Sequence, residues 1–189
     1  MTYLIPCSSS KKVPVDIQHG SLDDLYMSEL LGPHRNELIA RRGIPLTWCR
    51  TMPAYQLYSG SRSVIYSRIS YENWMKPCVQ VLILSALFGW VRHTDRLPYY
   101  DLKMNGKQGL PMSPEKFWRD KVDLVGLLGH HDYVDLLSKN YKKALRAADM
   151  GDRPLEYIGR GQNIGDYLET QLTQLNCHER NHQLRQDLL

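Results

Sequence analysis

A short run of apolar residues that stops at a serine is the feature that most constrains the fold of this chain. Residues 79–84 are apolar except at Gln80, and they are followed by Ser85 and a turn at Gly89. A short apolar run bounded by turn residues is typical of a buried strand. In α/β folds, reactive groups gather in the crevice at the carboxyl ends of such strands. We therefore predict a functional site directly after Ser85.

The residues that follow this strand carry several kinds of reactive group. Arg92 supplies a guanidinium, Asp95 and Asp101 supply carboxylates, and Tyr99 and Tyr100 supply phenols. A loop that only connects two elements would not need this mixture. We take all of these side chains as candidate site residues.

Strand-like and helix-like patterns alternate along the chain. The predicted strands cover residues 2–6, 55–58, 79–84, 133–137 and 154–158. The predicted helices cover residues 21–42 with a break at Gly32-Pro33, and residues 62–75, 113–128, 138–148 and 164–175. This alternation favours an α/β fold with a mostly parallel or mixed sheet flanked by helices. A length of 189 residues fits a single domain that spans residues 1–189.

Composition limits the possible partners. The net charge of +4 and the pI of about 8.8 are compatible with a polyanionic partner but do not require one. No apolar run approaches the roughly 20 residues that are needed to cross a bilayer. The first residues lack the basic and then apolar pattern of a signal peptide. We expect a cytoplasmic protein with no membrane partner.

The cysteine and histidine residues predict neither a disulfide framework nor a metal site. The four cysteines are scattered without a C-x-x-C pair: Cys7, Cys49, Cys78 and Cys177. Cys177, His178 and His182 offer three potential ligands, whereas a closed zinc site needs four. The pair His130-His131 is better explained as part of a solvated loop. We expect no metal and no cofactor.

The loop Pro6-Cys7-Ser8-Ser9-Ser10-Lys11-Lys12 directly follows the first predicted strand. Its hydroxyls, backbone donors and amines can form a cradle for a phosphate or an oxyanion. It is not a P-loop, because the glycines of that motif are missing. A lysine at this position can also act as a nucleophile if burial lowers its pKa. The alternative is an ordinary exposed polar loop.

The segment from Leu84 to Met104 resembles the YaaA superfamily, whose members have Leu-Ser-Gly-Leu-Tyr-Gly followed by Arg, Asp and Pro-Tyr-x-Leu-x-Met. The positions that keep the pattern are Leu84, Ser85, Gly89, Arg92, Asp95, Tyr100, Leu102 and Met104. Phe88 replaces a tyrosine, and Pro98 stands one place earlier than the family proline. The triplet Tyr58-Ser59-Gly60 is similar to the Tyr-x-Gly step of the same proteins.

A second resemblance concerns the first loop. Pro6-Cys7-x3-Lys11 resembles the Pro-Cys-x3-Lys motif of archaeosine synthases, in which the lysine takes part in covalent chemistry on a deazaguanine base held in RNA. The chain has Lys12-Val13 where those enzymes have Pro-Tyr. The resemblance implies a reactive Lys11, and this departure places that role in question.

Both resemblances imply work on nucleic acid. YaaA-type proteins are associated with DNA binding and with protection from oxidative damage, and related domains occur with tRNA base modification and with phage systems that hypermodify DNA. An enzyme that acts on a base extrudes it and stacks it between aromatic faces. Phe88, Trp90, Tyr99 and Tyr100 are candidate faces; core packing is the preferred interpretation of Phe88 and Trp90, and Tyr100 is the preferred stacking residue because it matches the family motif.

The first functional hypothesis is a DNA glycosylase that cleaves the N-glycosidic bond of a flipped-out base, or an enzyme that exchanges the base, in the context of defence against phages with modified DNA. Its partner would be double-stranded DNA with a modified base, or single-stranded DNA. Asp95 and Asp101 would stabilise an oxocarbenium-like transition state or activate water. Lys11 would protonate the leaving base or form a Schiff base at the sugar. The predicted substrate-binding residues are Cys7, Ser8, Ser10, Tyr58, Ser59, Arg62, Ser85, Arg92, Tyr99 and Tyr100.

The second hypothesis is a non-catalytic DNA-binding protein of the YaaA type that protects against oxidative stress. Lys11, Lys12, Arg62 and Arg92 would then contact phosphates, and Asp95 would pair with Arg92. A catalytic carboxylate must be open to a pocket, whereas a structural one is buried against an arginine. A small-molecule nucleotide enzyme is a third possibility. Under either DNA hypothesis, residues 8–11, 59–62 and 85–101 should converge on one cleft.

Overall fold

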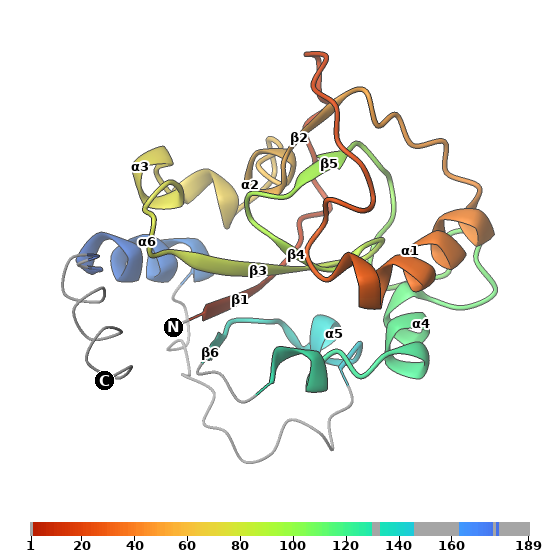
Figure 1. Cartoon of the computed structure of the whole chain (residues 1–189). Coiled ribbons are helices and arrows are strands. Elements are labelled where there is room, and N and C mark those ends of the chain that lie inside the picture. The colour runs from red at the N-terminus through yellow and green to blue at the C-terminus, as the bar shows by residue number, and fades with distance from the viewer. Residues whose placement is uncertain (1, 130–132, 146–162, 176, 178–189) are drawn as a thin grey trace, which may run out of the picture.

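A computed structural model of the chain describes residues 2–129, 133–145, 163–175 and 177 (Figure 1). Its main sheet has four strands in the order β4-β3-β1-β6. β1 (Thr2–Pro6) runs parallel to both β3 (Gln80–Ser85) and β6 (Tyr133–Asp135), and β4 (Gly89–Arg92) returns antiparallel to β3. The predicted α/β fold with a mostly parallel sheet is confirmed.

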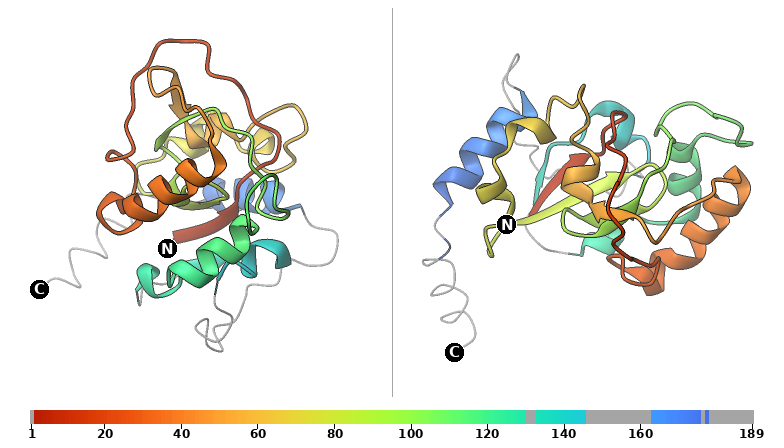
Figure 2. Two further views of the ribbon diagram at one scale, coloured as in Figure 1. Left: turned by 90° about the vertical axis from the view of Figure 1, so that its right-hand side faces the viewer. Right: turned by 90° about the horizontal axis from the view of Figure 1, so that it is seen from above.

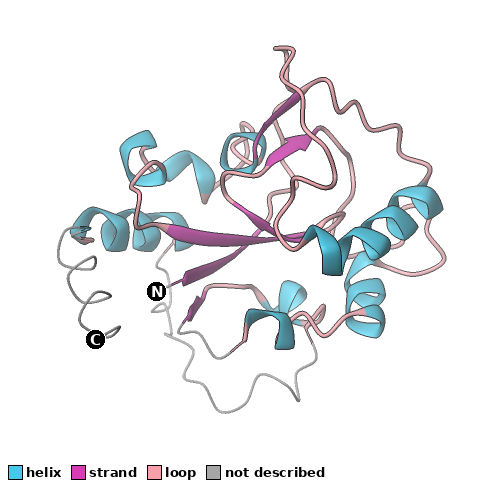
Figure 3. Cartoon of the chain, in the orientation of Figure 1, coloured by secondary structure: helices cyan, strands magenta, loops and turns pink. Residues whose placement is uncertain are grey.

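A second sheet and several helices surround the main sheet. β2 (Thr51–Pro53) and β5 (Arg96–Pro98) form an antiparallel pair that lies above the main sheet in Figure 1, next to α2 (Ala54–Leu57). α4 (Pro114–Lys121) and α5 (Lys139–Lys142) lie below the main sheet in Figure 1, and α1 (Ser28–Arg42) lies at its right-hand end; Figure 3 shows these helices around the strands. The remaining elements are η1 (Tyr66–Arg68), α3 (Tyr71–Trp74), η2 (Gly126–Leu128) and α6 (Ile164–Gln174).

The first helix begins later than predicted and passes through the predicted break. Ser21 and Asp24 exchange hydrogen bonds, in which each backbone N–H donates to the other side chain, so they close a local turn instead of starting the helix. α1 continues through Pro33 because Leu31 and Leu38 anchor it in the core. It ends at Gly43, whose φ of 63° is the left-handed conformation typical of a glycine C-cap.

The prediction of a strand at residues 55–58 was wrong. Ala54, Tyr55, Leu57 and Tyr58 are all buried, and the segment forms α2. A short run that is buried on every side does not distinguish a helix from a strand by its pattern. The backbone N–H of Ala54 donates to Asp95 O, and that of Tyr55 donates to His93 O, which fixes α2 on the chain that follows β4.

Several predicted boundaries also differ from the structure. Residues 62–75 form η1 and α3 instead of one helix, because Ser70 caps α3 by accepting a hydrogen bond from the backbone N–H of Asn73. The helix predicted over 113–128 ends at Lys121, and η2 follows it. The helix predicted over 138–148 forms α5 over 139–142; its last residues, 146–148, lie outside the described residues, as does the predicted strand at 154–158.

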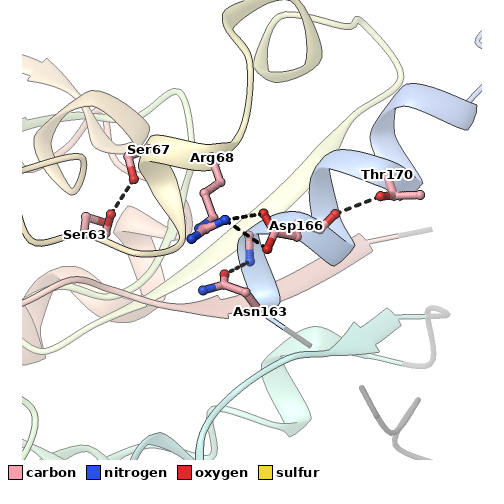
Figure 4. A network of polar contacts seen from close by, with 7 residues as sticks. Ser63, Ser67, Arg68, Asn163, Asp166 and Thr170 are labelled. Carbon is pink, nitrogen blue, oxygen red and sulfur yellow. Dashed lines mark hydrogen bonds and ion pairs between the residues drawn. The ribbon is translucent and has the colours of Figure 1, made fainter. Parts of the chain in front are cut away.

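α6, the last helix among the described residues, packs on the segment that contains η1 and α3. Asp166 forms an ion pair of 2.8 Å with Arg68, and Asn163 caps α6 by accepting a hydrogen bond from the N–H of Gly165 (Figure 4). A disulfide between Cys78 and Cys177 adds a covalent link between the two segments, which contradicts the prediction from cysteine spacing. Spacing in the sequence fails here because α6 brings Cys177 next to a residue 99 positions away.

Two further findings concern metals and membranes. Among the residues that the structure describes, no group of three or more His, Cys, Asp or Glu side chains is placed to hold a metal ion. His130, His131, His178 and His182 lie outside those residues. Within the same ranges, no helix combines the length and the apolar character that crossing a bilayer would require.

Candidate functional site

Two of the segments that were predicted to form the site meet at the carboxyl ends of β1 and β3. Pro6 is in register with Leu84, and the backbone N–H of Cys7 donates to Leu84 O at 3.1 Å. The parallel pairing therefore places the loop after β1 beside Ser85, the last residue of β3. This is the edge at which α/β proteins usually bind their ligands.

Lys11 lies against two tyrosine rings at this edge. Its Nζ is 4.5 Å from the centroid of the Tyr100 ring and 5.9 Å from that of Tyr58. A cation at such a distance is attracted by the negative face of an aromatic ring. The three residues come from separate segments, so the tertiary fold assembles this cluster.

The tyrosines are joined to Ser85 by a buried chain of hydroxyl groups. The Ser85 and Tyr100 hydroxyl oxygens are 2.9 Å apart, and those of Tyr100 and Tyr58 are 2.7 Å apart. Ser85 Oγ also accepts a hydrogen bond from the N–H of Phe88 at 3.1 Å. Burial raises the pKa values of Tyr58 and Tyr100 well above the ordinary value, so both phenols stay neutral.

Burial shifts the ionisation of Lys11 towards the neutral amine. Burial lowers the pKa of Lys11 because desolvation disfavours the ammonium ion, while the nearby Cys7 and Asp101 act in the opposite direction. Lys103 adds to the lowering by repulsion. A lysine whose pKa is lowered in this way is a better nucleophile and base at neutral pH than an exposed lysine.

Gly60 allows the third predicted site segment, residues 59–62, to approach the loop formed by residues 7–12, which we call the lysine loop. A Cβ atom on Gly60 would lie 2.5 Å from Ser10 Oγ and 2.8 Å from the backbone nitrogen of Lys11, closer than real contacts permit. The backbone N–H of Arg62 donates to Ser10 Oγ at 3.2 Å. The loop after α2 therefore closes on residues 10 and 11, and this contact explains the glycine of the Tyr58-Ser59-Gly60 triplet.

Tyr141, which was not among the residues predicted from the sequence, also lies at this edge of the sheet. The Tyr141 hydroxyl lies 3.2 Å from Cys7 Sγ and donates to Cys7 O at 2.7 Å. Burial raises its pKa above the ordinary value. Both residues line a cavity of about 330 Å³, with Ser8, Ser9, Leu102, Lys103, Met104, Asn105 and Asn140. Tyr141 lies 134 positions from Cys7 in a helix without a recognisable motif, so nothing in the sequence indicates the contact.

Asp95 and Arg92 do not join this cluster. Asp95 is 8% exposed, and its Oδ2 accepts hydrogen bonds from the N–H groups of Tyr26 at 2.9 Å and Arg92 at 3.0 Å. The exposed Arg92 guanidinium lies 4.7 Å from the centroid of the Tyr26 ring. Arg92 pairs with Leu82, three residues before Ser85, which places it about 10 Å further along the sheet.

Burial raises the pKa of Asp95, although the two N–H groups and the charges of Arg92 and Arg35 oppose the rise. The carboxylate is thus directed at backbone donors and holds the chain after β4 in place. Asp101 differs from it: this residue is exposed, and its charge acts on Lys11.

The remaining candidates are divided between the surface and the core. Tyr99 is 42% exposed and Arg62 is also exposed, while Ser8, Ser10 and Ser59 are half-buried around the lysine loop. Phe88 and Trp90 are fully buried. Trp90 Nε1 donates to Leu124 O at 2.8 Å, so this ring packs in the core and does not face a ligand.

Fold and site together define an α/β protein with a lysine, a serine and two tyrosines assembled at the carboxyl edge of a mostly parallel sheet. Residues 27–158 match the family described as peroxide stress protein YaaA, and the chain belongs to this family. The matched region contains Tyr58, Ser85 and Tyr100, whereas Lys11 precedes it. No match was found among curated protein sequences. The likeness of Pro6-Cys7-x3-Lys11 to archaeosine synthases stays a prediction.

Proposed function

We propose that this protein binds DNA and removes a base from it, with Lys11 as the reactive group. The observation that carries this proposal is the position of the amine, which is half-buried against the Tyr100 ring with a lowered pKa. A lysine that only contacts a phosphate needs no burial, because an exposed ammonium ion serves equally well. Groups whose pKa is shifted by burial and by neighbouring charges are common at functional sites.

The chemistry that suits this amine is substitution at the sugar carbon C1′. The nitrogen lone pair forms a bond to C1′ while the bond between C1′ and the base breaks. The base leaves with that electron pair and takes up a proton, and the ammonium formed on Lys11 releases one. Opening of the sugar ring gives a Schiff base, which water hydrolyses to restore the amine.

The neighbouring residues have separate parts in this proposal. We assign to Asp101 the part of opposing the positive charge that develops at the sugar; its exposed carboxylate and its electrostatic effect on Lys11 support this assignment. Ser8, Ser10 and Ser59 offer hydroxyls to the base or the sugar. Arg62 is exposed beside Ser10 and would hold a phosphate.

A DNA-binding protein without chemistry is the second candidate, and one observation favours it. Asp95, the carboxylate that is best matched to the family motif, is buried and directed at backbone N–H groups. Such a carboxylate stabilises a loop and is not available to a substrate. In this case the cationic residues of the site would contact phosphates only, in a protective role under peroxide stress.

One experiment separates the two candidates. The protein is incubated with plain, base-oxidised and hypermodified duplexes, free bases are measured by mass spectrometry, and borohydride is used to trap a Schiff base. We expect a trapped adduct that falls at least about a hundredfold in Lys11→Met while DNA binding persists. Lys12→Met is the matched control, because Lys12 is an exposed lysine one position further along.

Two results would contradict the lysine mechanism. Release of free base that continues in Lys11→Met, without any trapped adduct, would assign the reaction to an activated water. Binding to all three duplexes with no free base from any of them would establish the second candidate.

A further inference from the structure

The segment that follows Lys11 exposes an unusual amount of apolar surface. Val13, Val15 and Ile17 are 63%, 76% and 69% exposed, and we call residues 13–17 the apolar loop. It stands out from the body of the molecule beyond β2 and β5 (Figures 1 and 2). Isolated exposed apolar residues are common, but three at alternate positions of one projecting loop call for an explanation.

The apolar loop is anchored at both of its ends. The N–H of Lys12 donates to Leu57 O at 2.8 Å, and Gln18 O accepts hydrogen bonds from the N–H and the hydroxyl of Thr51 at 3.0 and 2.7 Å. Pro14 is buried between two exposed valines. The exposed Asp16 stands at a bend between Val15 and Ile17, so the buried Pro14 and the two anchors, and not a regular alternation, hold the loop away from the protein.

Charged residues flank the apolar loop on both sides. Lys11 and Lys12 precede it, and the exposed Arg50 forms a β-bridge with Gln18 at its far end. The exposed Asp16 is the one acidic residue inside the loop, against three basic residues around it. A DNA duplex matches the arrangement, because its phosphates lie on the outside and its stacked bases form an apolar interior.

Two further apolar side chains continue this surface. Tyr71 and Met75 are 60% and 49% exposed, and they line a hollow of about 410 Å³ together with Val15 of the apolar loop. Arg96 lines the same hollow. The guanidinium of Arg96 donates to Thr51 Oγ1 and Thr51 O at 3.1 and 2.8 Å, so the exposed Tyr71 ring is the part of this hollow that can stack with a base.

We propose that the apolar loop inserts into the base stack of duplex DNA and fills the space left when a base turns out towards Lys11. This inference rests on the proposed function and names the element that opens the duplex. Val13 follows Lys11 by two positions, so their Cα atoms are at most about 7.6 Å apart. Bases in a strand are spaced by about 3.4 Å, so an inserted valine reaches the vacated position or the next step.

The test uses a duplex with 2-aminopurine next to the target base, since the fluorescence of this analogue rises when it is unstacked. We compare the wild type with the triple variant Val13→Ser, Val15→Ser, Ile17→Ser. The control is Leu30→Ser, which alters an exposed leucine of α1 (57% exposed). All four positions are exposed, so the substitutions leave the core intact.

We expect both the fluorescence rise and the amount of trapped adduct to be at least about tenfold smaller in the triple variant than in the wild type. The reason is that the loop supplies part of the energy that unstacks the base. Its salt dependence of binding should match that of the wild type, since no phosphate contact is removed. The control should behave like the wild type in both assays.

Three outcomes would overturn the inference. Unchanged fluorescence and trapping in the triple variant would remove the loop from base extrusion while leaving the proposed function intact. A wild-type dimer that the triple variant converts to a monomer would make the apolar loop a contact between two copies of the chain. If the wild type binds none of the duplexes, the proposed function fails and the inference fails with it.

Discussion

At the scale of single residues, the amine of Lys11 and the carboxylate of Asp95 are both at least half-buried but have different partners. Both side chains are removed from water, which disfavours the charged form of each. The carboxylate accepts two backbone N–H bonds at 2.9 and 3.0 Å. The amine lies against aromatic rings. The first arrangement stabilises a loop, whereas the second leaves the amine without a hydrogen-bonded carboxylate partner among the described residues and makes it the candidate reactive group of our proposal.

This difference predicts the pH dependence of Lys11. Because its pKa is lowered, a larger fraction of the amine is neutral at any given pH than for an ordinary lysine. Labelling by an amine-specific reagent should therefore rise with pH through a midpoint below about 10.4, the usual value for lysine. Mass spectrometry of the labelled peptides measures this midpoint, and the exposed Lys12 corrects for the reactivity of the reagent. A Lys11 midpoint at or above 10.4 would remove the argument for a reactive amine.

At the scale of secondary-structure elements, one buried arginine holds α1 to the main sheet. Arg35 is fully buried; its Nε donates to Phe88 O at 2.8 Å, and its NH2 donates to Tyr26 O and Trp90 O at 2.7 and 2.8 Å. Phe88 lies in the turn between β3 and β4, Trp90 lies in β4, and Tyr26 precedes α1. One side chain of α1 thus binds two separate stretches of backbone.

Replacing this arginine should be strongly destabilising. Arg35→Met leaves three backbone carbonyls without their donor, and we expect it to lower the free energy of unfolding by about 3 kcal/mol or more. Arg41→Met is the control on the same helix. The ion pair of Arg41 with Glu37 is partly exposed, and such a pair contributes less than about 1 kcal/mol to the free energy of unfolding. Denaturant unfolding monitored by circular dichroism measures both values. Equal losses in the two variants would show that Arg35 is not the anchor of α1.

Only some of the elements could be predicted from the sequence. The strands at residues 2–6 and 79–84 and the helix from Ile164 were recognisable because each has a continuous pattern with clear end signals. β4 and β5 were missed, since residues 85–101 were interpreted as a site loop. Their strand conformation depends on pairing with β3 and β2, which a local pattern does not report.

At the scale of the whole molecule, α6 closes the structure against η1 and α3. Besides the ion pair between Arg68 and Asp166, the side chain of Asn73 donates to Thr173 Oγ1 at 2.8 Å, and Lys76 Nζ donates to Leu172 O. The disulfide between Cys78 and Cys177 adds to these contacts. The last helix is therefore held by both covalent and polar links to the segment that leads into β3.

The disulfide predicts a redox-dependent stability. Its two cysteines are 99 positions apart, and closing so long a loop typically stabilises a protein by about 2–4 kcal/mol. Cys177→Ser should lower the free energy of unfolding by this amount in non-reducing buffer, and a reductant should have the same effect on the wild type. Cys49→Ser, which removes an exposed free thiol, should have little effect. A Cys177→Ser variant as stable as Cys49→Ser would show that the link contributes nothing to folding.

The sequence by itself determined the α/β class, the central strands and the likeness to YaaA proteins, because these depend on local patterns and short motifs. It also placed Lys11, Tyr58, Ser85 and Tyr100 among the candidate site residues. Only the tertiary structure decided which candidates meet. The parallel register of β1 and β3 brings Lys11 and Ser85 to one edge, and the antiparallel return of β4 carries Asp95 away from it. Such distances depend on strand register and on long-range packing, which no single segment of the sequence encodes.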